Sequence, residues 1–253
     1  MWESGDAYEA YVGRWSRRVA ARFVPALGVP ANVGWLDVGC GTGVLSAAVL
    51  ALAEPERVTG VDPSTGFLAT ARAMVPGVEF VVGDARALPF ADGTFGAVVS
   101  GLALNFVPES RRAVAEFARV AAAGAVVSAY VWDYAEGMEL MRYFWDAALL
   151  LDPAIAGLDE GLRFPLCRPG ALQAAWEEAG LRGVTVAAID VPTPFASFDD
   201  YWLPFLGRQG SAPAYVATLS PAHREALREE LRHRLPEGPF ELTARAWAVR
   251  GIR

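Results

Sequence analysis

Three alternating glycines near residue 40 give this chain its clearest potential for chemistry. Residues 35–43 read Trp-Leu-Asp-Val-Gly-Cys-Gly-Thr-Gly, and an apolar run from Val44 to Leu52 follows them directly. Because glycine lacks a Cβ atom, a loop with Gly39, Gly41 and Gly43 can adopt positive φ angles and bring bare backbone N–H groups against a ligand at the positive end of a helix. The spacing therefore predicts a strand, a sharp loop and a helix that together bind a nucleotide or a related cofactor.

Asp37 lies two residues before the first of these glycines, at the end of a strand that should be buried. An unpaired buried carboxylate is costly, so its side chain must face N–H donors or a cation, and a positively charged ligand would suit it. The competing dinucleotide-binding pattern, G-x-G-x-x-G, needs a third glycine where this chain has Val44. The pattern therefore disfavours a nicotinamide-dependent oxidoreductase.

The run from Leu36 to Gly43 resembles the first motif of the class I S-adenosylmethionine-dependent methyltransferases, whose Asp-Val-Gly-Cys-Gly-Thr-Gly pattern is matched at every position. The resemblance implies an α/β fold with a Rossmann-like, seven-stranded, mostly parallel sheet, helices on both faces and late helical insertions that form a cap. It also implies S-adenosyl-L-methionine as the cofactor. Asp37, Gly39 and Gly41 are then cofactor-binding residues.

A second carboxylate ends the next expected strand, Arg57 to Asp62. Nucleotide-binding folds place an acid about 20 residues beyond the glycine loop on the ribose hydroxyls. The alternative role for Asp62 is to cap the helix expected from Thr65 to Met74, but Ser64 can supply that cap itself. We therefore assign Asp62 to the ribose and include Pro63 and Ser64 in the cofactor site.

A third acid, Asp84, follows the expected strand from Val78 to Val82. Open α/β sheets bind ligands at the carboxyl ends of their strands. In the resembled family this position contacts adenine, the Asp accepting a hydrogen bond from the exocyclic amine, and Ala85 lies beside it. The alternative is an ordinary turn acid before Leu88. The apolar strand from Phe95 to Ser100 comes next, and the cofactor's methionine part is expected beside its exit, at Gly101 and Leu102.

The segment from Tyr8 to Leu27 has aromatic and apolar residues at spacings of four, which indicates an amphipathic helix. Residues 11–17 resemble the N-terminal segment of a small-molecule subgroup related to the ubiquinone/menaquinone C-methyltransferases, where such a helix closes over the cofactor. By that resemblance Tyr11, Arg14 and Trp15 bind the cofactor, and Arg14 suits its carboxylate. A helix that only packs on the domain is the alternative.

Beyond residue 135 the resemblance thins, and local patterns predict the remaining elements. The segment from Pro192 to Pro239 is long for a loop and contains a charged helix, so it is expected to be an inserted helical cap. We expect a single methyltransferase domain over residues 1–253, with a lid helix at 8–27 and helical insertions at about 135–168 and 192–239. The other expected elements are helices over 108–121, 136–151, 168–180 and 221–235, and strands over 124–132, 184–191 and 241–249.

The composition restricts the class of partner. The chain has 253 residues, a net charge of −7 and a pI of about 5.0, so attraction to a nucleic-acid backbone has no obvious source. Cys40 and Cys167 are expected to be free thiols, and neither they nor His223 and His233 have the spacing of a metal site. Without a secretory signal or an apolar span of about 18 residues, we expect a cytoplasmic protein with no membrane partner.

The expected function is methyl transfer from S-adenosylmethionine to a small acceptor. Alignment of acceptor, methyl and sulfur can supply several kcal/mol, so no catalytic residue is assigned. A mostly apolar or aromatic acceptor is expected because aromatic residues occur in the segments that should roof the site, although each of them could instead only pack the cap: Trp15, Phe106, Phe144, Trp145, Trp202 and Phe205. A cofactor-binding protein of the same fold without transferase activity is the second hypothesis.

Overall fold

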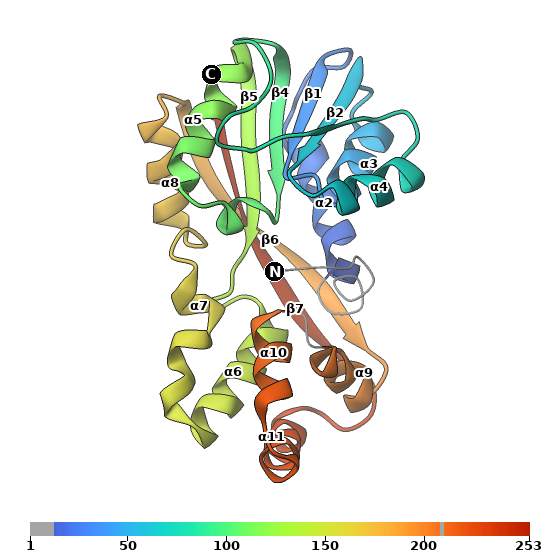
Figure 1. Cartoon of the computed structure of the whole chain (residues 1–253), viewed down its shortest axis with the longest axis vertical. Coiled ribbons are helices and arrows are strands. Elements are labelled where there is room, and N and C mark those ends of the chain that lie inside the picture. The colour runs from blue at the N-terminus through green and yellow to red at the C-terminus, as the bar shows by residue number, and fades with distance from the viewer. Residues whose placement is uncertain (1–12, 208–209) are drawn as a thin grey trace. The chain divides into compact units, whose positions relative to one another are not determined.

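A computed structural model describes residues 13–207 and 210–253, which fall into two compact units (Figure 1). The sheet unit consists of residues 16–131, 168–189 and 247–253. The helical unit consists of residues 132–167 and 190–246, together with the described residues 13–15. Both predicted insertions thus belong to one unit, and their place as insertions in a single domain stays a prediction.

No helix in the described parts of the chain has the length and apolar character required to cross a membrane.

Seven strands form one sheet in the order β3-β2-β1-β4-β5-β7-β6, which confirms the predicted fold class. The first five strands pair in parallel. β7 runs antiparallel to β5, since Gly124 N donates to Arg253 O and Ser128 Oγ donates to Val249 O farther along β5. The strands are β1 (Gly34–Val38), β2 (Arg57–Asp62), β3 (Glu79–Val82), β4 (Phe95–Gly101), β5 (Ala121–Trp132), β6 (Arg182–Phe195) and β7 (Phe240–Ile252).

Three late strands differ from their predicted bounds. β5 begins at Ala121 rather than at Gly124, because Ala121 pairs with Phe95 and the register then shifts. Gly124 has a φ of 80°, a conformation that allows such an irregularity inside a strand. β6 and β7 are longer than predicted and continue from the sheet unit into the helical unit.

Helices follow the parallel strands at nearly the predicted residues. The helix after the glycine loop, α3 (Val44–Leu52), and the next one, α4 (Thr65–Met74), have the predicted bounds. Ser64 caps α4, its Oγ accepting from Phe67 N at 3.2 Å, so Asp62 is free for another role. The remaining helical elements of this unit are α2 (Arg14–Ala26, of which residues 16–26 belong here), η2 (Leu104–Phe106), α5 (Ser110–Val120) and α8 (Pro169–Glu178).

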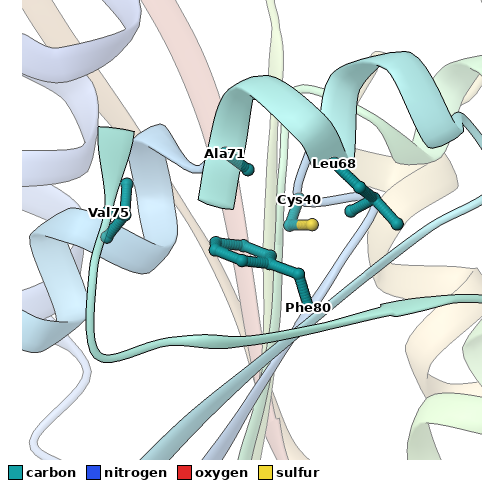
Figure 2. Packing of buried hydrophobic residues seen from close by; sticks show 5 residues of the cluster. All are labelled: Cys40, Leu68, Ala71, Val75 and Phe80. Atoms are coloured by element: carbon teal, nitrogen blue, oxygen red, sulfur yellow. The ribbon is translucent and has the colours of Figure 1, made fainter. Parts of the chain in front are cut away.

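A small apolar cluster joins the glycine loop to β3 and α4 (Figure 2). It consists of Cys40, Leu68, Ala71, Val75 and Phe80, all buried. The ring of Phe80 lies under α4, and the Cys40 side chain points into the same cluster. The glycine loop, which follows the first strand, is thereby packed against α4 and the third strand.

The helical unit has an aromatic core. Phe144 and Phe205 stack with ring centroids 4.5 Å apart, and the Tyr201 hydroxyl donates to Leu140 O at 3.0 Å. The two segments predicted to be insertions consist largely of helices. The elements of this unit are α6 (Glu139–Leu151), η3 (Pro153–Leu158), α7 (Glu160–Arg163), α9 (Phe198–Trp202), η4 (Leu203–Leu206), α10 (Ser211–Thr218) and α11 (Pro221–Arg234).

Gly60 of β2 faces this apolar cluster, and a side chain there should destabilise the sheet unit. A Cβ atom on Gly60 would lie 2.7 Å from the Phe80 ring and 2.9 Å from the Cys40 sulfur. Gly60→Ala is expected to lower the free energy of unfolding by about 1–3 kcal/mol through overpacking, as measured by urea denaturation. Gly66→Ala on the exposed side of α4 is the control, because its Cβ meets only Ser64 Oγ at 3.8 Å. Equal free energies of unfolding for Gly60→Ala and Gly66→Ala would show that the cluster accommodates the added methyl group without loss of stability.

Candidate functional site

The glycine loop has the backbone conformation that its sequence predicts. The φ angles of Gly39, Gly41 and Gly43 are 72°, 54° and 89°. Gly43 is the N-cap of α3. Because glycine has no side chain, it cannot accept a hydrogen bond from the first backbone N–H groups of that helix. A Cβ atom on Gly41 would meet nothing within 4 Å, so there is open space beside this part of the backbone.

Asp62 joins the ends of β1 and β2. Its Oδ2 accepts from Gly41 N at 3.0 Å, and its Oδ1 accepts from Ser64 N at 2.8 Å. Burial raises the pKa of the Asp62 carboxyl, while the two backbone N–H groups oppose that shift. Each carboxylate oxygen has further acceptor capacity, so both can still receive the hydroxyl groups of a cis-diol.

Asp37 is fully buried at the end of β1, as its position in the sequence requires. Its Oδ2 accepts from the Ser46 hydroxyl at 2.7 Å, whereas its Oδ1 has no hydrogen-bond partner. Burial raises the pKa of Asp37 to about 7, although hydrogen bonds from Ser46 favour the charged form and the nearby Asp62 disfavours it. Sequence reasoning did not identify Ser46, because an apolar helix interior gives no sign that its one serine faces an acid.

Asp84 lies at the end of β3 in a tight turn with Arg86. Its Oδ1 accepts from the backbone N of Arg86 at 2.8 Å, and its Oδ2 accepts from the Arg86 guanidinium at 2.6 Å. Arg86 holds the pKa of Asp84 at about 2, so this carboxylate is an acceptor only. The Asp84 side chain is 45% exposed and therefore open to a ligand, while Ala85 is buried. The contribution of Arg86 was not predicted.

The exit of β4 lies beside the glycine loop. A Cβ atom on Gly39 would lie 2.5 Å from the Cβ of Ala103, so only glycine allows these two segments to approach. A Cβ on Gly101 would lie 2.6 Å from the Tyr130 hydroxyl oxygen, and Leu102 adopts a φ of 58°. Hydrogen bonds join the end of β2 to the glycine loop and to Gly83, so the carboxyl ends of the first three strands lie together.

The predicted lid residues divide between described and undescribed parts of the chain. Tyr11 lies outside the described residues. Arg14 and Trp15 belong to the helical unit, where Arg14 donates to Asp200 Oδ1 at 2.9 Å. The Arg14 guanidinium carbon lies 4.3 Å from the Trp15 ring centroid and 4.9 Å from that of Phe195. Asp200 and Phe195 were not identified from sequence, since they lie far from Arg14 along the chain.

The other candidate groups are less suited to chemistry. Cys40 and Cys167 are free and buried, and burial raises the pKa of both thiols. His223 and His233 are exposed on α11. Among the described residues, no group of His, Cys, Asp and Glu is arranged to hold a metal ion.

The aromatic residues expected to roof the site pack differently from one another. Phe106 is half exposed on η2 of the sheet unit, whereas the others are buried in the helical unit: Trp15, Phe144, Trp145, Trp202 and Phe205. Their role in enclosing an acceptor stays a prediction.

Comparison with known proteins agrees with this geometry. Residues 36–129 match a family described as a methyltransferase domain. A demethylmenaquinone methyltransferase of Renibacterium salmoninarum is 38% identical over 116 residues, which are 44% of this chain and 44% of that protein. A 2-methyl-6-phytyl-1,4-hydroquinone methyltransferase of Synechocystis sp. is 31% identical over 192 residues. That match covers 72% of this chain and 57% of the relative, so the chain spans only about half the length of these proteins.

Similar folds occur among solved structures. The phosphoethanolamine N-methyltransferase 2 of Haemonchus contortus, in complex with phosphomonomethylethanolamine and S-adenosylhomocysteine, superposes with a TM-score of 0.59 at 15% identity. The superposition covers 98% of this chain and 56% of that one. At this identity the likeness concerns the fold alone.

Asp37 should give the protein a distinctive dependence of stability on pH. Because its pKa rises from 3.8 to about 7 on folding, the folded protein binds a proton in this window that the unfolded chain releases. The free energy of unfolding should therefore fall as pH rises from about 4 to 7, by up to about 1.4 kcal/mol per pH unit for this group.

Urea unfolding of the wild type and of Asp37→Asn, compared at pH 5 and pH 7, isolates this contribution because the amide does not titrate. The wild type should lose roughly 1–3 kcal/mol relative to the variant between the two pH values. Parallel pH profiles would show that Asp37 ionises in the folded protein without a penalty.

Proposed function

The chain belongs to the class I S-adenosylmethionine-dependent methyltransferases, and we propose that it transfers a methyl group from S-adenosyl-L-methionine to a small, mostly apolar or aromatic acceptor. One observation carries the cofactor part of the proposal: the carboxyl ends of β1 and β2 meet where Gly41 N binds the Asp62 carboxylate, beside open space. Strand ends of this kind are where open α/β sheets bind nucleotides.

The residues at these strand ends suit the parts of the cofactor. Asp62 would accept the ribose hydroxyls, since both of its oxygens are fixed by backbone N–H groups from either side. Asp84, held as an acceptor by Arg86, would receive the exocyclic amine of adenine, with Ala85 beside the base. The unpartnered Oδ1 of Asp37 fits a cofactor that carries positive charge, because a nearby cation lowers the cost of its ionisation.

Three further assignments complete the proposed cofactor site. Gly39 and Gly101 allow the exit of β4 to pack closely against the glycine loop and Tyr130, and the cofactor's methionine part is proposed to lie at this exit, next to Leu102. Pro63 and Ser64 directly follow Asp62, the residue proposed to bind the ribose, and Ser64 N donates to its carboxylate. Tyr11, Arg14 and Trp15 stay proposed lid residues, with Arg14 as the partner of the cofactor's carboxylate.

The bound cofactor supplies an electrophilic methyl group on its sulfonium sulfur. The protein's task is then to align the acceptor with that methyl and to exclude water, which can supply several kcal/mol without a dedicated acid or base. We assign no catalytic side chain. An aromatic acceptor agrees with the hydroquinone and menaquinone names of the two relatives, while the net charge of −7 disfavours nucleic acid. A cytoplasmic location stays a prediction.

Asp62→Ala should weaken binding of S-adenosylmethionine by about 10- to 100-fold, because charge-assisted hydrogen bonds to the ribose are lost. Isothermal titration calorimetry measures the affinity, and circular dichroism checks that the variant is folded. Glu225→Ala removes an exposed acid from α11 and serves as the control. An unchanged affinity in folded Asp62→Ala would remove Asp62 from the ribose.

The acceptor class can be tested by methyl transfer from radiolabelled cofactor. Quinols, phenols, amines and small acids should be offered separately, beside bulk RNA, DNA and protein. We expect label in at least one apolar or aromatic small molecule and none in the macromolecules. Labelling of a macromolecule together with inert small acceptors would overturn the acceptor class, and cofactor binding without any transfer would favour the second hypothesis.

A further inference from the structure

The segment that carries Asp84 has almost no regular structure of its own. Residues 83–94 connect β3 to β4, and the only pairing within this described segment is an isolated bridge between Asp84 and Ala87. A loop without strand or helix pairing depends on other groups to fix its shape. In this loop those groups are charged side chains of α5.

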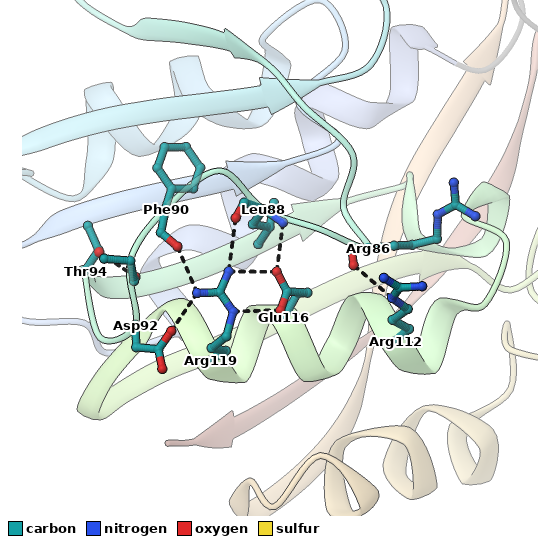
Figure 3. Close-up of polar contacts among 9 residues, drawn as sticks. Arg86, Leu88, Phe90, Asp92, Thr94, Arg112, Glu116 and Arg119 are labelled. Atoms are coloured by element: carbon teal, nitrogen blue, oxygen red, sulfur yellow. Dashed lines mark hydrogen bonds and ion pairs between the residues drawn. The ribbon is translucent and has the colours of Figure 1, made fainter.

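Arg119 of α5 uses every donor that it has, three on the loop and two on Glu116 of the same helix. Its Nη1 donates to Phe90 O at 2.8 Å and to Asp92 Oδ1 at 2.7 Å, and its Nη2 donates to Leu88 O at 3.0 Å (Figure 3). Its Nη2 and Nε also donate to the two Glu116 oxygens, both at 2.7 Å. These bonds use all five guanidinium N–H groups, and a lysine, which has three donors, cannot make the same set.

Glu116 completes the attachment from the other side. Its Oε2 accepts from Leu88 N at 2.8 Å, so both backbone polar groups of Leu88 are held by the same pair of side chains. One turn earlier on α5, Arg112 Nε donates to Arg86 O at 3.1 Å. Figure 3 shows Arg112 and Arg119 reaching from one helix to the carbonyl groups of alternate loop residues, Arg86, Leu88 and Phe90.

The contacts lead directly to Asp84, the carboxylate proposed above to bind adenine. Arg86, whose carbonyl is held by Arg112, binds Asp84 through both its backbone N and its guanidinium. Asp84 is 45% exposed, so neighbouring atoms do not confine it by packing alone. Its position is set by the path of the loop, and the path is set by α5.

We propose that Glu116 and Arg119 are positioning residues that hold the loop so that Asp84 accepts from the exocyclic amine of the cofactor's base, and that they thereby set the preference for adenine. The inference rests on the proposed function. A carboxylate placed correctly attracts an amine and repels a carbonyl in the same position. Because hydrogen-bond strength falls steeply with distance and angle, a loosened loop loses this discrimination before it loses contact with the ligand.

The test uses two probes, S-adenosylhomocysteine and its analogue with hypoxanthine in place of adenine, which carries a carbonyl where adenine has the amine. Calorimetry gives the affinity of each. The wild type should prefer the adenine probe by about tenfold or more, and Asp84→Asn should abolish or reverse the preference because an amide can donate to the carbonyl.

Glu116→Gln and Arg119→Lys should lower the preference by about five- to tenfold, mainly through weaker binding of the adenine probe. Arg111→Lys is the matched control, because Arg111 lies on α5 but pairs with Glu178 of α8 instead of the loop. It should leave the preference unchanged. A purely structural role for Glu116 and Arg119 would lower thermal stability and weaken both probes alike, so an unchanged preference in the two folded variants overturns the proposal.

The outcomes separate this proposal from the function on which it rests. If the wild type bound neither probe, the proposed function would fail. If it bound both probes equally, the adenine role of Asp84 would fail and the proposal with it. A preference lost in Asp84→Asn but kept in Glu116→Gln and Arg119→Lys would leave the function standing and overturn only the positioning role.

Discussion

The hydrogen bonds of the Asp62 carboxylate are the interaction on which the site geometry depends. One oxygen binds the glycine loop and the other binds the first turn after β2, so a single side chain fixes two strand exits relative to each other. The bonds from Gly39 and Cys40 to Val61 O reinforce the same junction. Since burial disfavours a charged carboxylate, the ionised Asp62 is stabilised only while these N–H groups face it. The position of the carboxylate and the conformation of the glycine loop therefore depend on each other.

Local patterns in the sequence were sufficient to predict most helices and strands of the sheet unit. Val44 to Leu52 and Thr65 to Met74 were predicted to the residue because glycine and serine mark their starts. The three acids at or just beyond the ends of β1, β2 and β3 were found from their positions in or after apolar runs, and the parallel topology then brings their strand ends together. The capping role of Ser64 was also predictable, because the preference of serine for the N-cap depends only on neighbouring residues of the chain.

The residues that bind these acids, or that hold the loop around them, could not be predicted from the sequence in the same way. Ser46, Arg86, Glu116 and Arg119 act across turns or between elements, and a single sequence contains no period or spacing that identifies such pairs. The same reason applies to Asp200, which is 186 positions from Arg14 along the chain. The assembly of both insertions into one compact unit likewise depends on contacts among distant aromatic residues, such as Phe144 with Phe205.

The orientation of Cys40 has a consequence for how the site can be observed. Its sulfur lies in the apolar cluster under α4, and burial raises the pKa of the thiol, so the reactive thiolate is scarce in the folded state. Alkylating reagents can reach it only when α4 separates locally from β3. The rate of labelling at Cys40 therefore measures the free energy of that local opening. The glycine loop thus contains a natural kinetic probe of its own packing.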